Sequence, residues 1–369
     1  MKRLWATKLI FVAVFLFFFE SIAAADSDAD DQKAVAALKG LGAHTQLDAQ
    51  GNVVLVNFAR MKDRAQLTDA KLGRINWKVL PHVQIVNLSF TPITDAGLAH
   101  LKAVRDLKEL DLSYTNVTDV GIAMLRDFPG LESLHYGSKH VTAASVRHLK
   151  DVKKLTSLRI GNVRFSRVEL AELKHLTRLK RLRISAARIS DNSLAFLPRL
   201  KELESLDISF NGTRLTNNCL HHVRKLSGLR ELALCSNVRI NDVGLERLQE
   251  LTNLRKLDLN GTRITSSGLT HLKNMVHLTD LQLGATHITD AGLVHLKGLK
   301  NLQFLNLSGT PITDAGIKHL NGLQTLERVL LDYTKTTSAG VGKLRKELPD
   351  AKITARGEYR GKIGAGSKK

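Results

Sequence analysis

A repeat of 24 residues fills most of this 369-residue chain and constrains its fold more than any other feature. Rows that start at Val83, Leu107 and nine later leucines follow one another at intervals of 24, 25 or 26 residues, and eleven rows fill residues 83–350. The shared pattern is L-x-x-L-x-L-x-x-T-x-I-T-D-x-G-L-x-x-L-x-x-L-x-x, and the rows from Leu278 and Leu302 agree at 13 of 24 positions. A period of this length indicates a solenoid of stacked units.

Each row predicts one short strand followed by one short helix. The segment L-x-x-L-x-L ends in the period-two alternation of a strand. Thr-Asp pairs such as Thr94-Asp95 and Thr313-Asp314 predict helix starts, because the threonine oxygen accepts a hydrogen bond from a free backbone N–H group. The segment G-L-x-x-L-x-x-L then has helical apolar spacing. Since one coil cannot bury its own apolar side, the coils are expected to stack and share a core.

This pattern resembles the leucine-rich repeat superfamily over residues 83–350, and it is most similar to secreted bacterial repeat proteins that carry the sequence ITDAGL. The resemblance implies an α/β fold, the leucine-rich repeat solenoid. In that fold a right-handed β/α superhelix carries a parallel sheet on its concave side and short helices on its convex side.

Two features of the strand-to-helix turns give further expectations. The threonine that follows each strand is expected to turn inward and to hydrogen-bond neighbouring backbone. This column holds Thr91, Thr115, Thr262, Thr286, Thr310 and Thr334. In the sixth row, which is two residues longer than the template, Asn211-Gly212 predicts an exposed turn instead.

The first 25 residues have the pattern of a secretory signal peptide. Basic residues precede an apolar run over residues 9–19, and Ala23-Ala24-Ala25 provides an Ala-x-Ala cleavage site. Eleven apolar residues fall short of the ~20 that a membrane-spanning helix needs, so an uncleaved anchor is the weaker alternative. The sequence predicts an exported protein, secreted, periplasmic or part of the cell envelope.

Both ends of the repeat array are expected to carry covers, because the terminal coils of a solenoid need a polar outer face. Residues 26–82 predict an N-terminal cap made of a helix, a hairpin and a degenerate repeat, with Trp77 packed inside it. Residues 351–369 predict a closing strand and a basic tail rich in Gly and Lys.

Charge is distributed unevenly. Rows three to five, residues 131–202, hold 16 basic and 6 acidic residues, which is +10 of the formal net charge of +20. These rows also depart from the template, with Lys139, Val163 and Ala187 in the threonine column. One interpretation is decayed repeats with solvated charge. The other is an anion-binding surface, since clustered like charge repels itself and guanidinium groups suit carboxylate, phosphate or sulfate.

The residues that flank the second leucine of each row are expected on the concave face. The predicted ligand-binding residues there are Arg159, Arg181, Arg183 and His135. At the edge of this patch the sequence predicts His140, Arg164, Arg188 and Arg214.

The sequence predicts no enzyme, no cofactor and no metal site. The histidines of the helical side (His100, His148, His222, His271, His295 and His319) read as a repeated solvent-facing position, with a metal site in that column as the alternative. Cys219 and Cys235 fall on different sides of the coil, so a disulfide between them is not expected. No nucleophile–base arrangement or phosphate loop departs from the repeat.

The resulting prediction is a monomeric, non-catalytic recognition protein whose partner is an acidic protein surface or an anionic polysaccharide. Two alternatives stay open: a structural scaffold of the cell envelope without a single ligand, and binding of a polyanion or nucleic acid through the basic face. Nucleic acid is disfavoured by the export signal and by the small number of aromatic residues expected on the concave side. Those residues are Phe90, Tyr114, Phe210, Phe304 and Tyr333.

Overall fold

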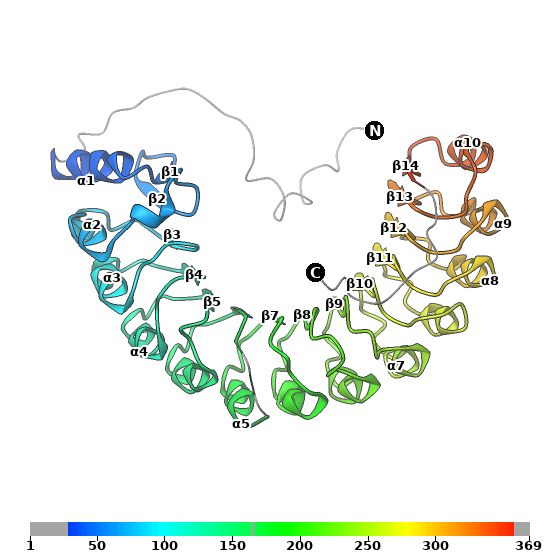
Figure 1. Ribbon diagram of the computed structural model, residues 1–369, viewed down its shortest axis with the longest axis horizontal. Helices are drawn as coiled ribbons and strands as arrows, with labels where there is room; N and C mark the ends of the chain where they lie inside the picture. Colours follow the sequence, from blue (N-terminus) through cyan, green and yellow to red (C-terminus); the bar gives the residue numbers. More distant parts are fainter. Residues whose placement is uncertain (1–28, 164, 166, 358–369) are drawn as a thin grey trace.

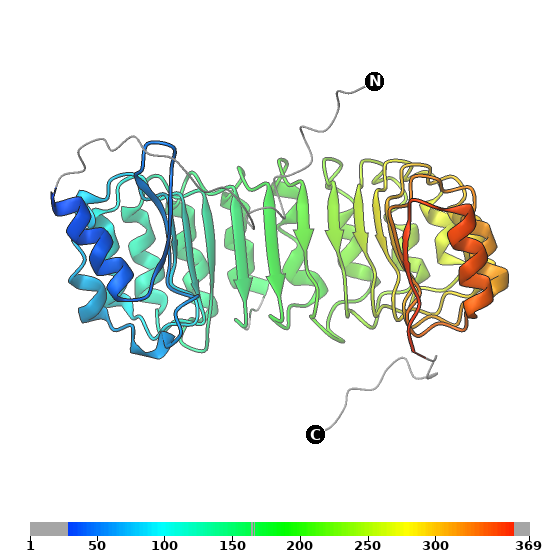
Figure 2. The ribbon, with the colours of Figure 1, turned by 90° about the horizontal axis from the view of Figure 1, so that it is seen from above.

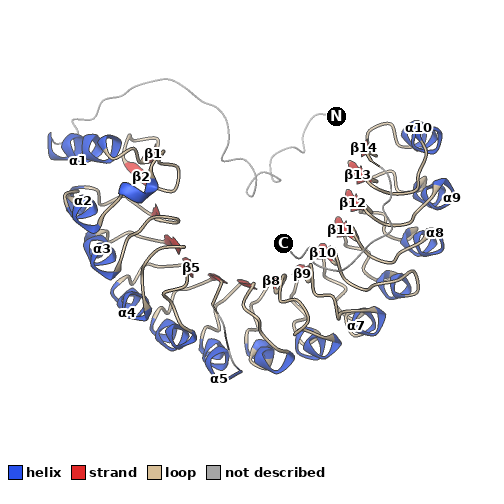
Figure 3. Ribbon diagram, viewed as in Figure 1, coloured by secondary structure: helices blue, strands red, loops and turns tan. Residues whose placement is uncertain are grey.

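The computed structural model describes residues 29–163, 165 and 167–357. The chain forms an open arc in which the strands line the inner side and the helices the outer side (Figure 1, Figure 3). From above, the strands cross the band side by side along its length (Figure 2). The expected solenoid, with a concave sheet and convex helices, is therefore confirmed. The predicted signal peptide and residues 358–369 of the predicted tail lie outside the described residues.

The described residues contain one sheet of fourteen strands in chain order. The strands are β1 (His44–Leu47), β2 (Val53–Asn57), β3 (Ile85–Asn87), β4 (Glu109–Ser113), β5 (Ser133–Gly137), β6 (Ser157–Gly161), β7 (Arg181–Ser185), β8 (Ser205–Asp207), β9 (Glu231–Ala233), β10 (Lys256–Asp258), β11 (Asp280–Gln282), β12 (Phe304–Asn306), β13 (Arg328–Leu330) and β14 (Lys352–Thr354).

Helices on the convex side are short and alternate between α and 3₁₀ geometry. The α-helices are α1 (Ala29–Gly40), α2 (Asp69–Gly73), α3 (Asp95–His100), α4 (Asp119–Ala123), α5 (Arg167–Leu170), α6 (Leu220–Val223), α7 (Asp242–Glu246), α8 (Asp290–Leu293), α9 (Asp314–Ile317) and α10 (Ser338–Glu347). The 3₁₀ helices are η1 (Arg64–Gln66), η2 (Trp77–Val79), η3 (Leu101–Ala103), η4 (Met124–Asp127), η5 (Ala143–Asp151), η6 (Ala171–His175), η7 (Asp191–Leu194), η8 (Leu197–Arg199), η9 (Asn217–Cys219), η10 (Gly268–Leu272), η11 (Val294–Leu296) and η12 (Lys318–Leu320).

Because of the strand pairing, residues at the same position of successive repeats lie next to one another in space. Strands β1 and β2 form an antiparallel hairpin, and every later neighbour in the described sheet pairs in parallel. Leu110, Leu134, Leu158 and Leu182 stand opposite one another and are buried. Because side chains alternate along a strand, the residues on either side of these leucines face the concave surface.

The N-terminal elements continue into the repeats without a break in the sheet, since β2 pairs directly with β3. Trp77 is buried, and its Nε1–H group donates to the carbonyl of Leu72 at 3.2 Å. Thr68 caps α2 by accepting from the N–H group of Lys71. A helix, a hairpin and a repeat-like turn thus precede the first full repeat, while the boundaries of a separate cap stay a prediction.

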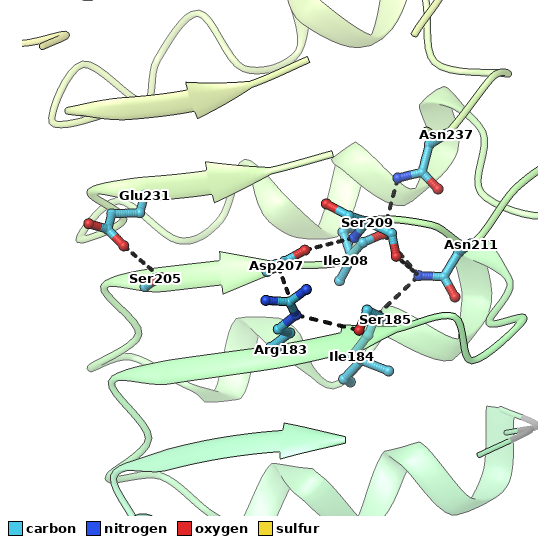
Figure 4. A network of polar contacts seen from close by, with 10 residues as sticks. All are labelled: Arg183, Ile184, Ser185, Ser205, Asp207, Ile208, Ser209, Asn211, Glu231 and Asn237. Carbon is cyan, nitrogen blue, oxygen red and sulfur yellow. Dashed lines mark hydrogen bonds and ion pairs between the residues drawn. The ribbon is translucent and has the colours of Figure 1, made fainter. Parts of the chain in front are cut away.

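The threonine column turns inward as expected. Each of the six hydroxyl groups is buried and donates to the carbonyl three residues earlier, at 2.6–2.7 Å. The expectation of an exposed turn at Asn211 is wrong. Asn211 is buried in this same column, and its Nδ2–H group donates to the carbonyls of Ile184 and Ile208 at 3.1 and 2.9 Å (Figure 4). An amide can replace the threonine hydroxyl because both donate to the carbonyls that the turn leaves free.

At many of the junctions between coils, a carboxylate links one helix start to the next. In the pair Asp95 and Thr118, Oδ1 of the aspartate accepts the threonine N–H at 2.9 Å and Oδ2 accepts its hydroxyl at 2.6 Å. We name this arrangement the Asp–Thr clasp. It occurs at Asp69–Thr94, Asp95–Thr118, Asp119–Thr142, Asp191–Thr216, Asp242–Thr265, Asp290–Thr313 and Asp314–Thr337.

The clasp explains why glycine follows the T-D pair in the template. A Cβ atom at Gly121 would collide with the carboxylate of Asp95, and one at Gly316 would collide with that of Asp290. Glycine therefore leaves room for the aspartate of the preceding repeat. The motif T-D-x-G encodes three parts of one contact between repeats: the threonine that donates, the aspartate that accepts, and the space it occupies.

Candidate binding surface

Five charged residues cross the concave face in one row. Asp111, His135, Arg159, Arg183 and Asp207 are successive register partners on strands β4 to β8. Three groups that can carry positive charge therefore stand side by side with a carboxylate at each end. The tertiary structure brings together the residues that the sequence predicted for the centre of the patch.

Both ends of this row are ion pairs. His135 Nδ1 lies 3.6 Å from the carboxylate of Asp111, and Arg183 Nε lies 3.1 Å from that of Asp207. Figure 4 shows Arg183 reaching Asp207 on the next strand and the hydroxyl of Ser185 on its own strand. Burial alone would raise the pKa of Asp111, but hydrogen bonds from His135 and Ser113 outweigh it and leave the pKa below its ordinary value. Asp207 thus neutralises part of the charge of Arg183, and Asp111 engages the imidazole of His135.

The two other predicted arginines are open to a ligand. Arg159 and Arg181 have exposed side chains, and within the described residues neither has an ion pair. Arg181 stands opposite Ser157, beside Arg159 on the neighbouring strand. Charge-assisted contacts to a ligand are therefore available first at Arg159 and Arg181.

The predicted edge residues lie apart from this row. His140, Arg188 and Arg214 are exposed in the turns that lead from strand to helix, which we name the strand-to-helix rim. Arg214 Nη1 donates to the backbone carbonyl of Arg188 at 3.4 Å, which fixes the position of its guanidinium group. Arg164 lies outside the described residues.

Much of the charge of repeats three to five lies on the opposite edge, which the sequence analysis did not identify as part of the patch. The turns from helix to strand carry exposed lysines and arginines at Lys150, Lys153, Lys154, Arg178, Lys180 and Lys201. Two pockets of about 440 and 280 Å³ open beside them. Lys153, Arg178 and Asp151 line the first, and Lys180, Arg230, Glu202 and Glu204 line the second. Arg181 follows Lys180 directly, so this basic rim is continuous with the concave face. In the sequence, this rim could have been recognised from the basic residues that recur just before each strand.

Beyond repeat five, the charge of the concave face changes from positive to negative. Glu231, Asp258 and Asp280 follow on β9 to β11. Burial, and then neighbouring acids, raise the pKa of Asp258, and burial is also the main cause of the raised pKa of Asp280. Oδ1 of Asp280 is buried and has no hydrogen-bond partner among the described residues. Negative charge on this part of the face would repel an acidic ligand.

The aromatic residues are not arranged as expected. Phe304 lies on β12, whereas the other four expected concave aromatics lie at the strand-to-helix rim. There the backbone is left-handed, with φ of +63° at Phe90, +57° at Tyr114, +60° at Phe210 and +58° at Tyr333. In each case the strand ends before the aromatic residue, which therefore lies in the turn that leads to the helix. A left-handed backbone costs a bulky residue roughly 1–2 kcal/mol.

The described residues hold two free cysteines and no candidate metal cluster. They contain no cluster of three or more histidine, cysteine, aspartate or glutamate side chains that could hold a metal ion. Cys219 is buried and Cys235 half-buried, both are free, and burial raises the pKa of each thiol. None of the helices in the described part of the chain has the length and apolar character of a membrane-spanning segment.

Comparison with known proteins identifies the family. The model of the leucine-rich repeat region matches residues 76–315, which is more than half of the chain. The chain belongs to the leucine-rich repeat family. Solenoids of this kind use their extended concave surfaces for binding. No curated protein matches this leucine-rich repeat chain in sequence.

Two solved structures illustrate the shared fold. An internalin (InlF) from Listeria monocytogenes has a TM-score of 0.57 at 19% identity, over 89% of this chain and 94% of the internalin. TLR13, solved as a complex with ssRNA13, has a TM-score of 0.54 at 21% identity, over 78% of this chain. This chain spans only 45% of the TLR13 chain. At these identities the likeness concerns the fold.

Proposed function

We propose that this leucine-rich repeat protein is a non-catalytic recognition protein that acts outside the cytoplasm as a monomer. It binds an acidic partner, a protein surface or an anionic polymer, on the basic centre of its concave face. We define the basic centre as Arg159, Arg181 and Arg183 with His135. Export rests on the signal-like pattern of residues 1–25.

One observation carries this proposal: Arg159 and Arg181 are exposed on adjacent strands of a rigid sheet, with no ion pair among the described residues. The sheet fixes the backbone positions from which these two side chains extend, which lowers part of the entropic cost of binding. The acidic strands after repeat five and the basic helix-to-strand rim direct an acidic partner to the same place. Guanidinium groups on neighbouring strands can make bidentate contacts with carboxylate, phosphate or sulfate.

The test replaces Arg159, Arg181 and Arg183 together by Ser and measures binding of a sulfated hexasaccharide and of hexaglutamate by calorimetry. Each lost contact should cost about 1 kcal/mol or somewhat more, so affinity for the probe that fits the site should fall on the order of a hundredfold. Binding should also weaken as salt rises, because the Debye length shortens from ~10 Å at 0.1 M to ~3 Å at 1 M.

A matched control removes the same charge elsewhere. Arg255, Lys273 and Lys297 are exposed basic residues of later repeats. Replacing these three by Ser changes the net charge equally but leaves the basic centre intact. If this control weakens binding as much as the first variant, attraction follows net charge and the proposed site is wrong.

A further inference from the structure

The left-handed turn at the strand-to-helix rim holds mostly small or polar residues. Its occupants in other repeats are Asn162, Ala186, Ser236, Gly261, Ala285 and Gly309, together with the aromatic residues Phe210 and Tyr333. Phe90 and Tyr114 occupy the same position in repeats one and two, although a bulky side chain is strained there. Strained residues of this kind concentrate where a ligand is held. The folded core does not need these rings, since both are about half exposed.

Phe90 and Tyr114 form an ordered stack that we name the aromatic ledge. Their ring centroids lie 4.6 Å apart and their planes differ by 11°. The guanidinium carbon of Arg64 lies 5.3 Å from the centroid of Phe90, and Nδ2 of Asn162 donates to the hydroxyl of Tyr114 at 2.6 Å. These contacts from repeats on either side hold two solvent-exposed rings in one orientation.

Among the described residues, one face of Tyr114 has no ring stacked on it. Arg64 and Tyr114 contact Phe90, whereas Tyr114 is stacked only on the side of repeat one. Its other face is turned toward repeat three, where the neighbouring Ser138 is buried and contributes no ring. Exposed Lys139 and His140 follow on the rim, so basic side chains lie on both sides of the ledge in chain order.

A ligand for this place needs a flat apolar face that carries negative charge beside it. A single-stranded nucleic acid stacks successive bases on successive aromatic faces, and the ledge offers a single free face. An acidic peptide carries its carboxylates on flexible side chains without a flat ring. A uronic acid unit of a polysaccharide satisfies both requirements, because its pyranose ring has an apolar C–H face and its carboxylate suits arginine and histidine.

We propose that the aromatic ledge is a carbohydrate subsite that stacks one uronic acid ring on Tyr114 while the same chain of sugars extends over the basic centre. This inference rests on the proposed function and names its ligand class, an acidic polysaccharide. The strained turn and the exposed stack are the features that distinguish this ligand from a generic polyanion.

The experiment measures binding of a hexagalacturonate by calorimetry, with the fully methyl-esterified hexamer and the oligonucleotide dT6 as comparisons. Tyr114→Gly should weaken hexagalacturonate binding at least tenfold. Its urea midpoint should stay the same or rise, because glycine adopts a φ near +57° without strain. The methyl ester should bind the unaltered protein at least tenfold more weakly than the free acid, since it lacks the carboxylates.

Phe210→Gly is the matched control. Phe210 occupies the same turn in repeat six and is equally exposed, and the described residues show no ring stacked on it. This variant should bind hexagalacturonate within twofold of the unaltered protein. Equal losses in the two variants would overturn the inference, as would unchanged affinity of Tyr114→Gly, tighter binding of dT6, or no measurable binding of hexagalacturonate by the unaltered protein.

The Ser variant of Arg159, Arg181 and Arg183 separates this inference from the proposed function. If that variant loses affinity and Tyr114→Gly does not, the basic centre is supported and the ledge is overturned. If only Tyr114→Gly loses affinity, the ledge is supported and the basic centre is not the site. If neither variant changes binding, both ideas are wrong.

Discussion

Repeats three to five and the remaining repeats share one core but differ in their polar contacts. Leu134, Leu158 and Leu182 are as fully buried as the leucines of the later strands. The Asp–Thr clasp, however, cannot form from repeat three to four or from four to five, because Ala143 and Arg167 replace the aspartate. The inward threonine is also missing from these repeats, and their net charge is +10.

This difference teaches that stacking and surface chemistry are separable in this solenoid. The leucine columns hold neighbouring coils together through apolar burial. The clasps add hydrogen bonds between the same coils but occupy the helix starts with carboxylates. Where the clasps are missing, Ala143 and Arg167 replace the acids without loss of the core. Two other junctions keep a weaker contact, with Asn217 bonded to Asn241 and Ser266 to Thr289.

The largest predicted effect comes from breaking a clasp. Asp95→Ala removes the acceptor of both the N–H and the hydroxyl group of Thr118. The free energy of unfolding should fall by about 2–3 kcal/mol, since hydrogen bonds to a charged group are strong and a part-buried donor is left unpaired. Urea unfolding followed by circular dichroism measures it. Asp151→Ala, at an exposed acid of repeat three, should change stability by less than about 0.5 kcal/mol. Equal losses would remove the distinction between the two regions.

The next largest loss of stability is expected when the space beside the Asp–Thr clasp is filled. Gly121→Ala places a Cβ atom against the carboxylate of Asp95 and should cost about 1–2 kcal/mol through overpacking. Part of this cost should disappear in the double variant with Asp95→Ala, which no longer carries the carboxylate. A double-mutant cycle in urea should show a coupling of at least about 0.5 kcal/mol. Strict additivity would mean that glycine is not there to accommodate the aspartate.

Local unfolding should be easier in the repeats where the Asp–Thr clasps are missing. Backbone amides of β6 and β7 should exchange with deuterium about tenfold faster than those of β11 and β12, which corresponds to about 1.4 kcal/mol in opening free energy. Hydrogen exchange followed by mass spectrometry measures both regions in one sample. Uniform protection along the arc would show that the leucine core alone sets local stability.

The smallest effect concerns the acidic strands. Asp280→Asn should raise the free energy of unfolding at pH 7 by about 0.5 kcal/mol after solvent screening, because burial raises the pKa of Asp280 and disfavours its charge. The folded state binds the proton more tightly, so the gain should vanish as the pH falls through the raised pKa toward the ordinary value of 3.8. Asp207→Asn should not stabilise, since Asp207 pairs with Arg183. A gain at both positions would contradict this contrast.

Some features of the surface could be predicted and others could not. The sequence indicated the strand positions of Arg159 and Arg181, because a period-two pattern fixes which residues share a face. It did not show that Arg183 contacts Asp207, a residue 24 positions later. It also placed Tyr114 on the concave side, although the strand ends before this residue, which lies in the turn that leads to the helix.

The sequence by itself determined the repeat, its register and the inward columns, because a 24-residue period with fixed leucines has one way to bury them. Only the tertiary structure decided what the polar residues do. Thr94 and Asp95 read as a local cap, yet the carboxylate of Asp95 reaches Thr118 in the next coil. Likewise, the net charge of repeats three to five is fixed by composition, while its division between the concave face and the rim depends on how the coils stack. Burial follows from local periodicity, whereas hydrogen bonds and ion pairs need atoms that only stacking brings within about 3 Å.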